Sequence, residues 1–204
     1  MAPNPNLKFE KRLWPTFPFI AGLDEAGRGA LAGPVCVGAV ILPRGDPRLS
    51  STLGGVRDSK LLPPSTRDLL APRIKAAASA WSVAYASAEE IDVLGIVPAT
   101  RLAAMRAIEL LNRYPDYLLT DFRLEVPELD IPQTAIVKGD RKSLSIAAAS
   151  ILAKTARDEV MRGLERQHPG YGLEKHKGYG TQAHRQALKR MGWSSIHRQT
   201  FKVK

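Results

Sequence analysis

The stretch FIAGLDEAGRGALAGPVCVGAVIL, residues 19–42, decides the fold. Its two ends, residues 19–24 and 34–42, are short apolar runs separated by a glycine-rich segment. Runs of this length and composition on either side of a turn are typical of a β-hairpin with largely buried strands. We therefore expect a hairpin at the start of the fold, with Asp24 and Glu25 where its first strand ends.

The rest of the chain adds three strands and several helices. The sequence predicts strands over residues 81–87, 116–122 and 131–137, and helices over residues 65–79, 97–113 and 181–191. From Ser143 onward, apolar residues recur at steps of three and four, which predicts a long helix. Because most of that apolar face is alanine, we expect this helix to lie close to the sheet. Five strands among helices indicate an α/β protein.

Length and composition indicate one globular domain. The chain has 204 residues, of which 44% are hydrophobic and 25% charged, a balance that argues against a disordered chain. Residues 1–18 contain several prolines and show no clear period, which predicts a flexible, loosely held arm. We expect residues 19–204 to form a single domain that includes a basic helical region near the C-terminus.

The charge is distributed unevenly. The formal net charge is +10, yet residues 1–137 hold 15 basic and 15 acidic side chains. Residues 138–204 hold 15 basic side chains and five acidic ones, so the whole excess lies in the last third. A basic region of this kind suits a polyanion such as nucleic acid. The alternative is a solvated helical surface that keeps the protein soluble.

Cysteine content and hydropathy indicate the compartment. Cys36 is the only cysteine, which excludes an intrachain disulfide and a cysteine zinc site and fits a reducing compartment. The sequence contains no apolar run long enough to span a membrane, and its first residues do not resemble a secretory signal. We expect a cytoplasmic protein that has no contact with a membrane.

Four carboxylates stand at predicted strand ends or loop edges: Asp24, Glu25, Asp121 and Asp140. If they converge, their mutual repulsion requires compensating cations. Oxygen ligands without histidine or thiolate favour Mg²⁺ or Mn²⁺, and two such ions are suited to phosphodiester hydrolysis. The alternative for each single acid is a turn cap or a partner for a nearby lysine.

Four strings carry a resemblance to a known family: DEAGRGALAGP at 24–34, DSK at 58–60, KGDRKSLSIAAASILAKTARD at 138–158 and HKGYGT at 176–181. In this order, and with Asp121 between them, they resemble the type 2 ribonucleases H, in particular the bacterial ribonucleases HII, over residues 19–198. The resemblance implies a ribonuclease H-like fold, namely a five-stranded mixed sheet flanked by helices with additional C-terminal helices. It also implies that the four acids named above are catalytic and bind two ions, Mg²⁺ or Mn²⁺.

The implied activity is that of an endoribonuclease acting on RNA–DNA hybrids and on duplex DNA that contains ribonucleotides. Such an enzyme cuts on the 5′ side of a ribonucleotide and leaves a 3′-hydroxyl and a 5′-phosphate. By the same resemblance, seven residues bind the substrate: Gly27, Arg28, Gly29, Lys60, Lys142, Ser143 and Tyr179. Glycines allow the backbone to approach a sugar closely, and an exposed Tyr179 ring would stack on the nucleotide after the ribonucleotide.

Each of these substrate-binding residues also has a structural interpretation. Residues 27–29 can form a tight turn, the two lysines can be ordinary surface residues, and Ser143 can cap a helix. The sequence departs from the family at Phe122, where a smaller residue is expected, which leaves the packing beside the acids open. His176 and His184 are expected to be solvated and to have no catalytic role.

Two other functions remain open at this stage. One is a catalytically inactive relative that binds nucleic acid, which would have little reason to keep four clustered acids. The other is a different two-metal nuclease of the same fold, such as a junction resolvase or an integrase-like enzyme, which would cut all-DNA substrates. In each case we expect a monomer.

Overall fold

The computed structural model describes residues 4–202, and its centre is one five-stranded sheet. The strands are β1 (Ile20–Ala26), β2 (Val35–Ile41), β3 (Ala80–Ala86), β4 (Tyr117–Asp121) and β5 (Gln133–Ile136). Their order in the sheet is β3-β2-β1-β4-β5. The first three strands pair antiparallel, whereas β4 pairs parallel with β1 and with β5. The predicted hairpin and the predicted mixed sheet are therefore confirmed.

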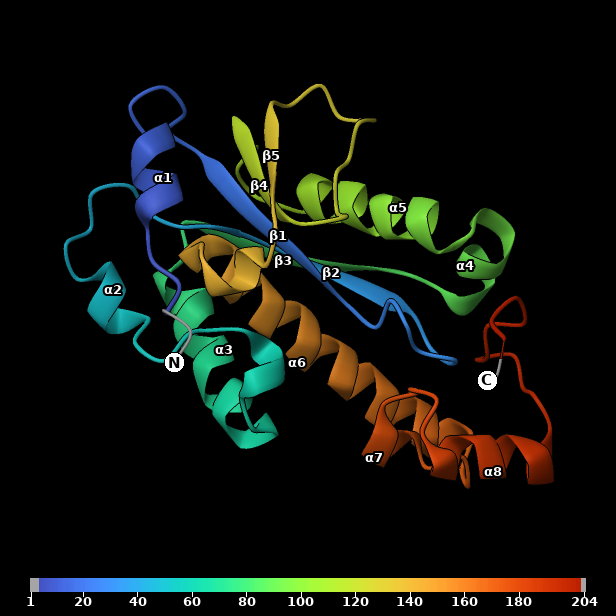
Figure 1. Ribbon diagram of the computed structural model, residues 1–204. Coiled ribbons are helices and arrows are strands. Elements are labelled where there is room, and N and C mark those ends of the chain that lie inside the picture. Colours follow the sequence, from blue (N-terminus) through green and yellow to red (C-terminus); the bar gives the residue numbers. More distant parts are fainter. Residues whose placement is uncertain (1–3, 203–204) are drawn as a thin grey trace.

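Helices cover both faces of the sheet (Figure 1). They are α1 (Lys8–Leu13), α2 (Leu49–Thr52), α3 (Pro64–Ala77), α4 (Ala88–Leu94), α5 (Ile96–Glu109), α6 (Leu144–Gln167), α7 (Leu173–His176) and α8 (Gln182–Met191). Helices α4 and α5 lie on one face, and α6 with α3 lies on the other (Figure 1). Beyond the sheet, α6 continues to α7 and α8, the additional C-terminal helices that the sequence predicts (Figure 1). None of the helices described is both long and apolar enough to cross a membrane.

The long helix α6 packs directly on the two central strands because glycine faces it from the sheet. A Cβ atom at Gly22 of β1 would come within 2.3 Å of the Ser145 backbone, and one at Gly38 of β2 within 2.4 Å of the Ala149 carbonyl oxygen. Ile146 and Ala149 are fully buried at this contact. The close approach places the residues before α6 beside the ends of β1 and β4, as the alanine-rich pattern predicts.

The N-terminal segment differs from the loosely held arm expected from the sequence. Residues 8–13 form α1, and Leu7, Glu10 and Trp14 are buried against the domain. The chain before α1 pairs with residues next to Ser143 through an isolated parallel bridge at Asn6. The expectation was wrong for residues 4–18 because the segment packs on the core, and its Asn6 and Glu10 contact residues more than 130 positions later. Residues 1–3 lie outside the described residues.

Candidate active site

An open pocket lies where the ends of the parallel strands meet. Three of the four predicted acids line it: Glu25 at the end of β1, Asp121 at the end of β4, and Asp140 after β5. Asp140 belongs to η2 (Gly139–Arg141), a short 3-10 helix that leads into α6. Asp24 is only 4% exposed and does not line the pocket, but its charge interacts with the other three acids. The four carboxylates are therefore brought together from three separate strand ends.

Burial and mutual repulsion dominate the electrostatics of this cluster. Burial raises the pKa of Asp24 well above its ordinary value, and the charges of Glu25, Asp121 and Asp140 raise it further. Burial also raises the pKa of Glu25, against the opposing effect of Arg28, whose guanidinium lies 3.8 Å from the Glu25 carboxylate. The pKa of Asp140 is raised to about 6, first by burial and then by neighbouring acids. Neighbouring acids disfavour the ionised forms of Asp24, Glu25 and Asp140, so a nearby cation would stabilise them.

A fifth carboxylate, Asp58, belongs to the same pocket and was not among the acids chosen from the sequence. It is 2% exposed and accepts hydrogen bonds from the Lys60 backbone at 2.9 Å and from the Arg141 guanidinium at 2.8 and 3.0 Å. Burial opposes its charge, but these hydrogen bonds outweigh burial and lower the pKa of Asp58. Asp58 thus fixes Lys60 and the η2 turn beside Asp140. The string DSK contains this residue and was the signal that could have identified it.

Lys60, to which the family resemblance assigns a contact with substrate, lines the pocket from η1 (Ser59–Leu61). Although burial works against its charge, Asp24, Asp140, Asp58 and Glu25 together raise the pKa of Lys60. Its ammonium group therefore stays protonated and partly compensates the acids.

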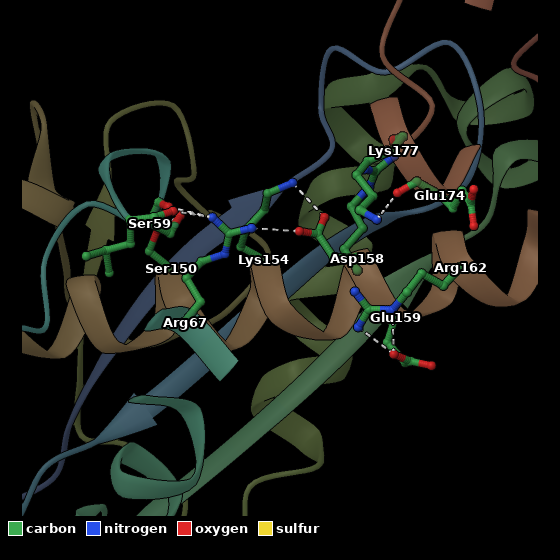
Figure 2. A network of polar contacts seen from close by, with 11 residues as sticks. Ser59, Arg67, Ser150, Lys154, Asp158, Glu159, Arg162, Glu174 and Lys177 are labelled. Atoms are coloured by element: carbon green, nitrogen blue, oxygen red, sulfur yellow. Dashed lines mark hydrogen bonds and ion pairs between the residues drawn. The ribbon is translucent and has the colours of Figure 1, made fainter. Parts of the chain in front are cut away.

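A buried polar network attaches η1 to α6 (Figure 2). Arg67 of α3 donates to the Ser59 carbonyl oxygen at 3.1 Å and to the Asp158 carboxylate at 2.9 Å. Lys154 donates to the same carboxylate at 2.6 Å, and the Ser150 hydroxyl donates to the Ser59 hydroxyl at 2.9 Å (Figure 2). Since both Arg67 and Asp158 are almost fully buried, the network fixes the position of the turn that carries the pocket lysine.

Two buried arginines hold the turn at residues 27–29. Arg198 donates to the carbonyl oxygens of Gly27 at 2.8 Å, Arg28 at 2.9 Å and Gly33 at 2.9 and 3.0 Å. Arg157 of α6 donates to three further carbonyl oxygens, those of Ala32, Pro34 and Lys177. Both arginines are fully buried, so part of the basic excess in the last third of the sequence is internal rather than on the surface.

The turn itself carries backbone donors beside the pocket that are unpaired within the described part of the chain. Gly27 has a φ of +91°, which favours glycine, whereas a Cβ atom at Gly29 would meet no atom within 4 Å. The backbone N–H groups of Arg28 and Gly29 form no hydrogen bond with any residue that the structure describes. The Arg28 side chain lines the pocket and donates to the Arg123 carbonyl oxygen at 3.2 Å. Residues 27–29 therefore form a tight turn and also leave two backbone N–H groups without a hydrogen-bond partner among the described residues.

Tyr179 lies beside this turn rather than in open solvent. It forms an isolated bridge with Ala30, and the centroid of its ring is 5.4 Å from the Arg157 guanidinium carbon and 5.6 Å from the Lys154 ammonium nitrogen. The residue is half-buried, so the expectation of a fully exposed ring is corrected: two cations and the turn cover part of it.

Two of the other predicted substrate contacts lie away from the acid pocket. Lys142 is exposed but faces a different pocket, beside α1. Ser143 is fully buried and caps α6 by accepting from the Ile146 backbone at 3.3 Å, so its predicted contact with substrate is corrected to the helix cap that was the alternative. Phe122 is 51% exposed at the pocket rim, so its size does not disturb the packing beside the acids.

The expectation of solvated histidines is wrong for His184. It is fully buried, its Nε2 lies 3.2 Å from the Nε2 of His197, and its ring stacks on His176 with centroids 4.3 Å apart. Burial lowers the pKa of His184, and it lowers the pKa of His197 to about 4. The lowered pKa values of His184 and His197 favour their neutral forms, and the contact of His184 with the Tyr179 carbonyl oxygen joins α8 to the loop of Tyr179. The three histidines come from α7, α8 and the segment after α8, so only the fold of the C-terminal region brings them together.

The donor set suits hard divalent cations. Within the described residues, no group of three or more His, Cys, Asp or Glu side chains is arranged so that it could hold a metal ion as it stands, so the fit depends on the chemistry of the donors. Asp24 and Glu25 are withdrawn from solvent, and the Glu25 Oε2 atom is buried without a hydrogen-bond partner. Carboxylate oxygens are the ligands that Mg²⁺ and Mn²⁺ prefer.

The sheet order and the flanking helices define a protein of the ribonuclease H-like fold class, and carboxylates at the strand ends suit a metal-dependent nuclease. The model of the ribonuclease HII family matches residues 21–204, and the chain therefore belongs to the ribonuclease HII family. It is a metal-dependent endoribonuclease that acts on RNA–DNA hybrids.

Relatives agree with this assignment over nearly the whole chain. A ribonuclease HII of Dehalococcoides mccartyi is 50% identical over 194 residues, covering 94% of this chain and 90% of the relative. One from Moorella thermoacetica is 51% identical over 183 residues, covering 90% and 86%. Among solved structures, the ribonuclease H2 of Pyrococcus horikoshii superposes with a TM-score of 0.75 at 25% identity, covering 91% of this chain and 94% of that chain.

Proposed function

We propose that the protein removes ribonucleotides from DNA by cutting the strand on the 5′ side of a ribonucleotide embedded in a duplex. Water attacks the phosphorus, the bond to the upstream 3′-oxygen breaks, and the products carry a 3′-hydroxyl and a 5′-phosphate. Because the substrate is cellular DNA, we place the enzyme in the cytoplasm, and we propose that it acts as a monomer. The function is supported most strongly by the convergence of Glu25, Asp121, Asp140 and Lys60 on one pocket beside the turn at residues 27–29. The fourth acid, buried Asp24, interacts with these three acids.

The cluster Asp24, Glu25, Asp121 and Asp140 would hold two ions, Mg²⁺ or Mn²⁺. When bound, two such ions activate the attacking water and stabilise the leaving oxygen. The protein contributes the arrangement of the ligands: the Asp121 carboxylate accepts from the Gly139 backbone at 2.6 Å, which fixes the turn that carries Asp140. Lys60 offers a protonated ammonium to the incoming phosphate and limits repulsion among the acids.

Recognition of the ribose falls to the turn at residues 27–29. The carbonyl oxygens of Gly27 and Arg28 are already engaged by Arg198, so the free N–H groups of Arg28 and Gly29 are the donors available to a 2′-oxygen. Tyr179, beside the same turn, would contact the sugar of the following nucleotide. A deoxyribose there fits against an aromatic face, and an added hydroxyl would have to be desolvated.

A labelled duplex with one ribonucleotide tests this function, together with an all-DNA duplex of the same sequence. We expect one cut on the 5′ side of the ribonucleotide with Mg²⁺ or Mn²⁺ and none with a chelator. Equal cutting of the all-DNA duplex would favour a junction resolvase or an integrase-like enzyme. Binding without cleavage under every metal condition would favour an inactive relative.

A further inference from the structure

The N-terminal segment is fixed to the turn that carries Asp140. The Asn6 backbone N–H donates to the Lys142 carbonyl oxygen at 3.1 Å, and the Leu144 N–H donates to the Asn6 carbonyl oxygen at 3.0 Å. The buried Glu10 carboxylate accepts from the Ser143 hydroxyl at 2.6 Å. The same carboxylate accepts from the backbone N–H and the hydroxyl of residue 145, at 3.0 and 2.7 Å. Helix α1 therefore has a fixed position beside the active site.

A basic pocket lies between α1 and this turn. It has a volume of about 420 Å³ and is lined by four cationic residues, Lys8, Arg12, Arg141 and Lys142, together with two asparagines and Phe9. None of the described residues that line it is an Asp or a Glu. The acid of α1, Glu10, is directed to the other side, into its contacts with the start of α6.

Most of the charge in the basic pocket is uncompensated. Lys8, Arg12 and Lys142 are exposed, and within the described part of the chain they form no ion pair. Arg141 is partly compensated by Asp58 at 2.8 Å. Lys8 and Arg12 are four residues apart on α1, so their side chains share one face and repel each other. An anion in the pocket would relieve this repulsion.

The basic pocket continues the cleavage pocket. Arg141 lines both, so the two pockets adjoin and an extended anion bound in one lies next to the other. The polyanion cut in the first pocket is a nucleic-acid duplex, whose phosphates recur along each strand. We propose that the basic pocket, through Lys8 and Arg12 of α1, binds a backbone phosphate of the duplex outside the cleavage site. This inference rests on the proposed function and extends its binding surface to the N-terminal helix.

The test compares two double variants that remove the same charge from opposite faces of one region. K8A/R12A removes two cations from the basic pocket. K11A/R44A removes two exposed cations that line a separate pocket on the other side of α1. Binding of a duplex with one ribonucleotide is measured by fluorescence anisotropy in chelator, over a range of salt concentrations. Thermal unfolding of both variants checks that the fold is retained.

We expect K8A/R12A to bind roughly tenfold more weakly, with a salt slope that is smaller by about 1–2 because each phosphate contact contributes about 0.9. K11A/R44A should bind like the wild type. Equal affinity and equal salt slopes for the two variants would overturn the proposal. Since binding is measured without metal, this result is independent of cleavage: a wild type that binds the duplex but does not cut it with Mg²⁺ or Mn²⁺ would refute the proposed function instead.

Discussion

Arg157 of α6 lies so close to Gly27 that a Cβ atom at Gly27 would come within 1.8 Å of the Arg157 Nε atom. The arginine cannot easily move away, because it is fully buried and donates to three carbonyl oxygens, among them that of Lys177 in the loop of Tyr179. The Arg157 side chain thus connects two elements. One is the turn at residues 27–29, which we propose contacts the ribose, and the other is the loop of Tyr179, which we propose contacts the next sugar.

Two glycine variants separate the structural role of this turn from its role in binding. Gly27→Ala adds a Cβ atom at a φ of +91° and against Arg157, so we expect it to lower the free energy of unfolding by about 1–3 kcal/mol. Gly29→Ala adds a Cβ atom in open space, so it should leave stability unchanged and weaken substrate binding. Denaturant unfolding and duplex binding measure the two effects. Equal stability of the two variants would contradict this division.

Arg198→Lys tests the second buried arginine. A lysine ammonium cannot reproduce the fork that reaches the carbonyl oxygens of Gly27, Arg28 and Gly33, so we expect a loss of about 2–4 kcal/mol in unfolding free energy. The turn should also become less well positioned, which raises KM for a single embedded ribonucleotide more than it lowers kcat. An unchanged KM in a folded variant would show that Arg198 only stabilises the domain.

The variant Tyr179→Ala tests whether the tyrosine ring contacts the sugar that follows the ribonucleotide. If the ring contacts the deoxyribose that follows the ribonucleotide, the variant should lose more activity on a single embedded ribonucleotide than on a continuous RNA strand. The measurement is kcat/KM on both substrates. Equal losses on both would assign the ring a general role in the loop instead.

The histidine cluster predicts a loss of stability in acid. Burial lowers the pKa of His197 to about 4, below its ordinary value of 6.5. Below pH 6.5 the unfolded chain therefore takes up a proton that the folded protein resists, and stability falls as the pH decreases from about 6.5 to about 4. We expect His197→Gln to be less stable at pH 7 but to show a shallower decrease over this range. If the free energy of unfolding decreased equally with pH in the two proteins, His197 would not be the cause of the decrease.

The sheet and the acids were predictable because their determinants are local. The hairpin follows from two apolar runs around a glycine-rich turn, and the alanine face of α6 correctly indicated a close approach to the sheet. Asp24, Asp121 and Asp140 stand at strand ends or just before a helix, so the topology of the sheet alone brings them to one edge. Their role in binding ions stays a prediction.

The parts that sequence reasoning missed depend on contacts between distant residues. The residues next to Glu10 in the sequence suggest an exposed acid. Its burial is explained only by its hydrogen bonds with Ser143 and Ser145, more than 130 positions away. Arg157 and Arg198 belong to the basic excess that we interpret from the sequence as a surface for nucleic acid. In the structure they bind backbone carbonyl oxygens, and because every residue has one, no sequence pattern identifies these partners. The string DSK contains Asp58, but only the fold shows that this carboxylate is buried and interacts with Asp140.

The central claim is that the acids at the strand ends bind divalent cations, and titration calorimetry with Mn²⁺ tests it most directly. The protein is first saturated with an RNA–DNA hybrid made resistant to cleavage, and uptake is compared between the wild type and Asp140→Asn. We predict uptake by the wild type and much weaker uptake by the variant, which should keep its affinity for the hybrid and lose nearly all turnover. No Mn²⁺ uptake by the hybrid-bound wild type, or equal uptake by the two proteins, would contradict the account.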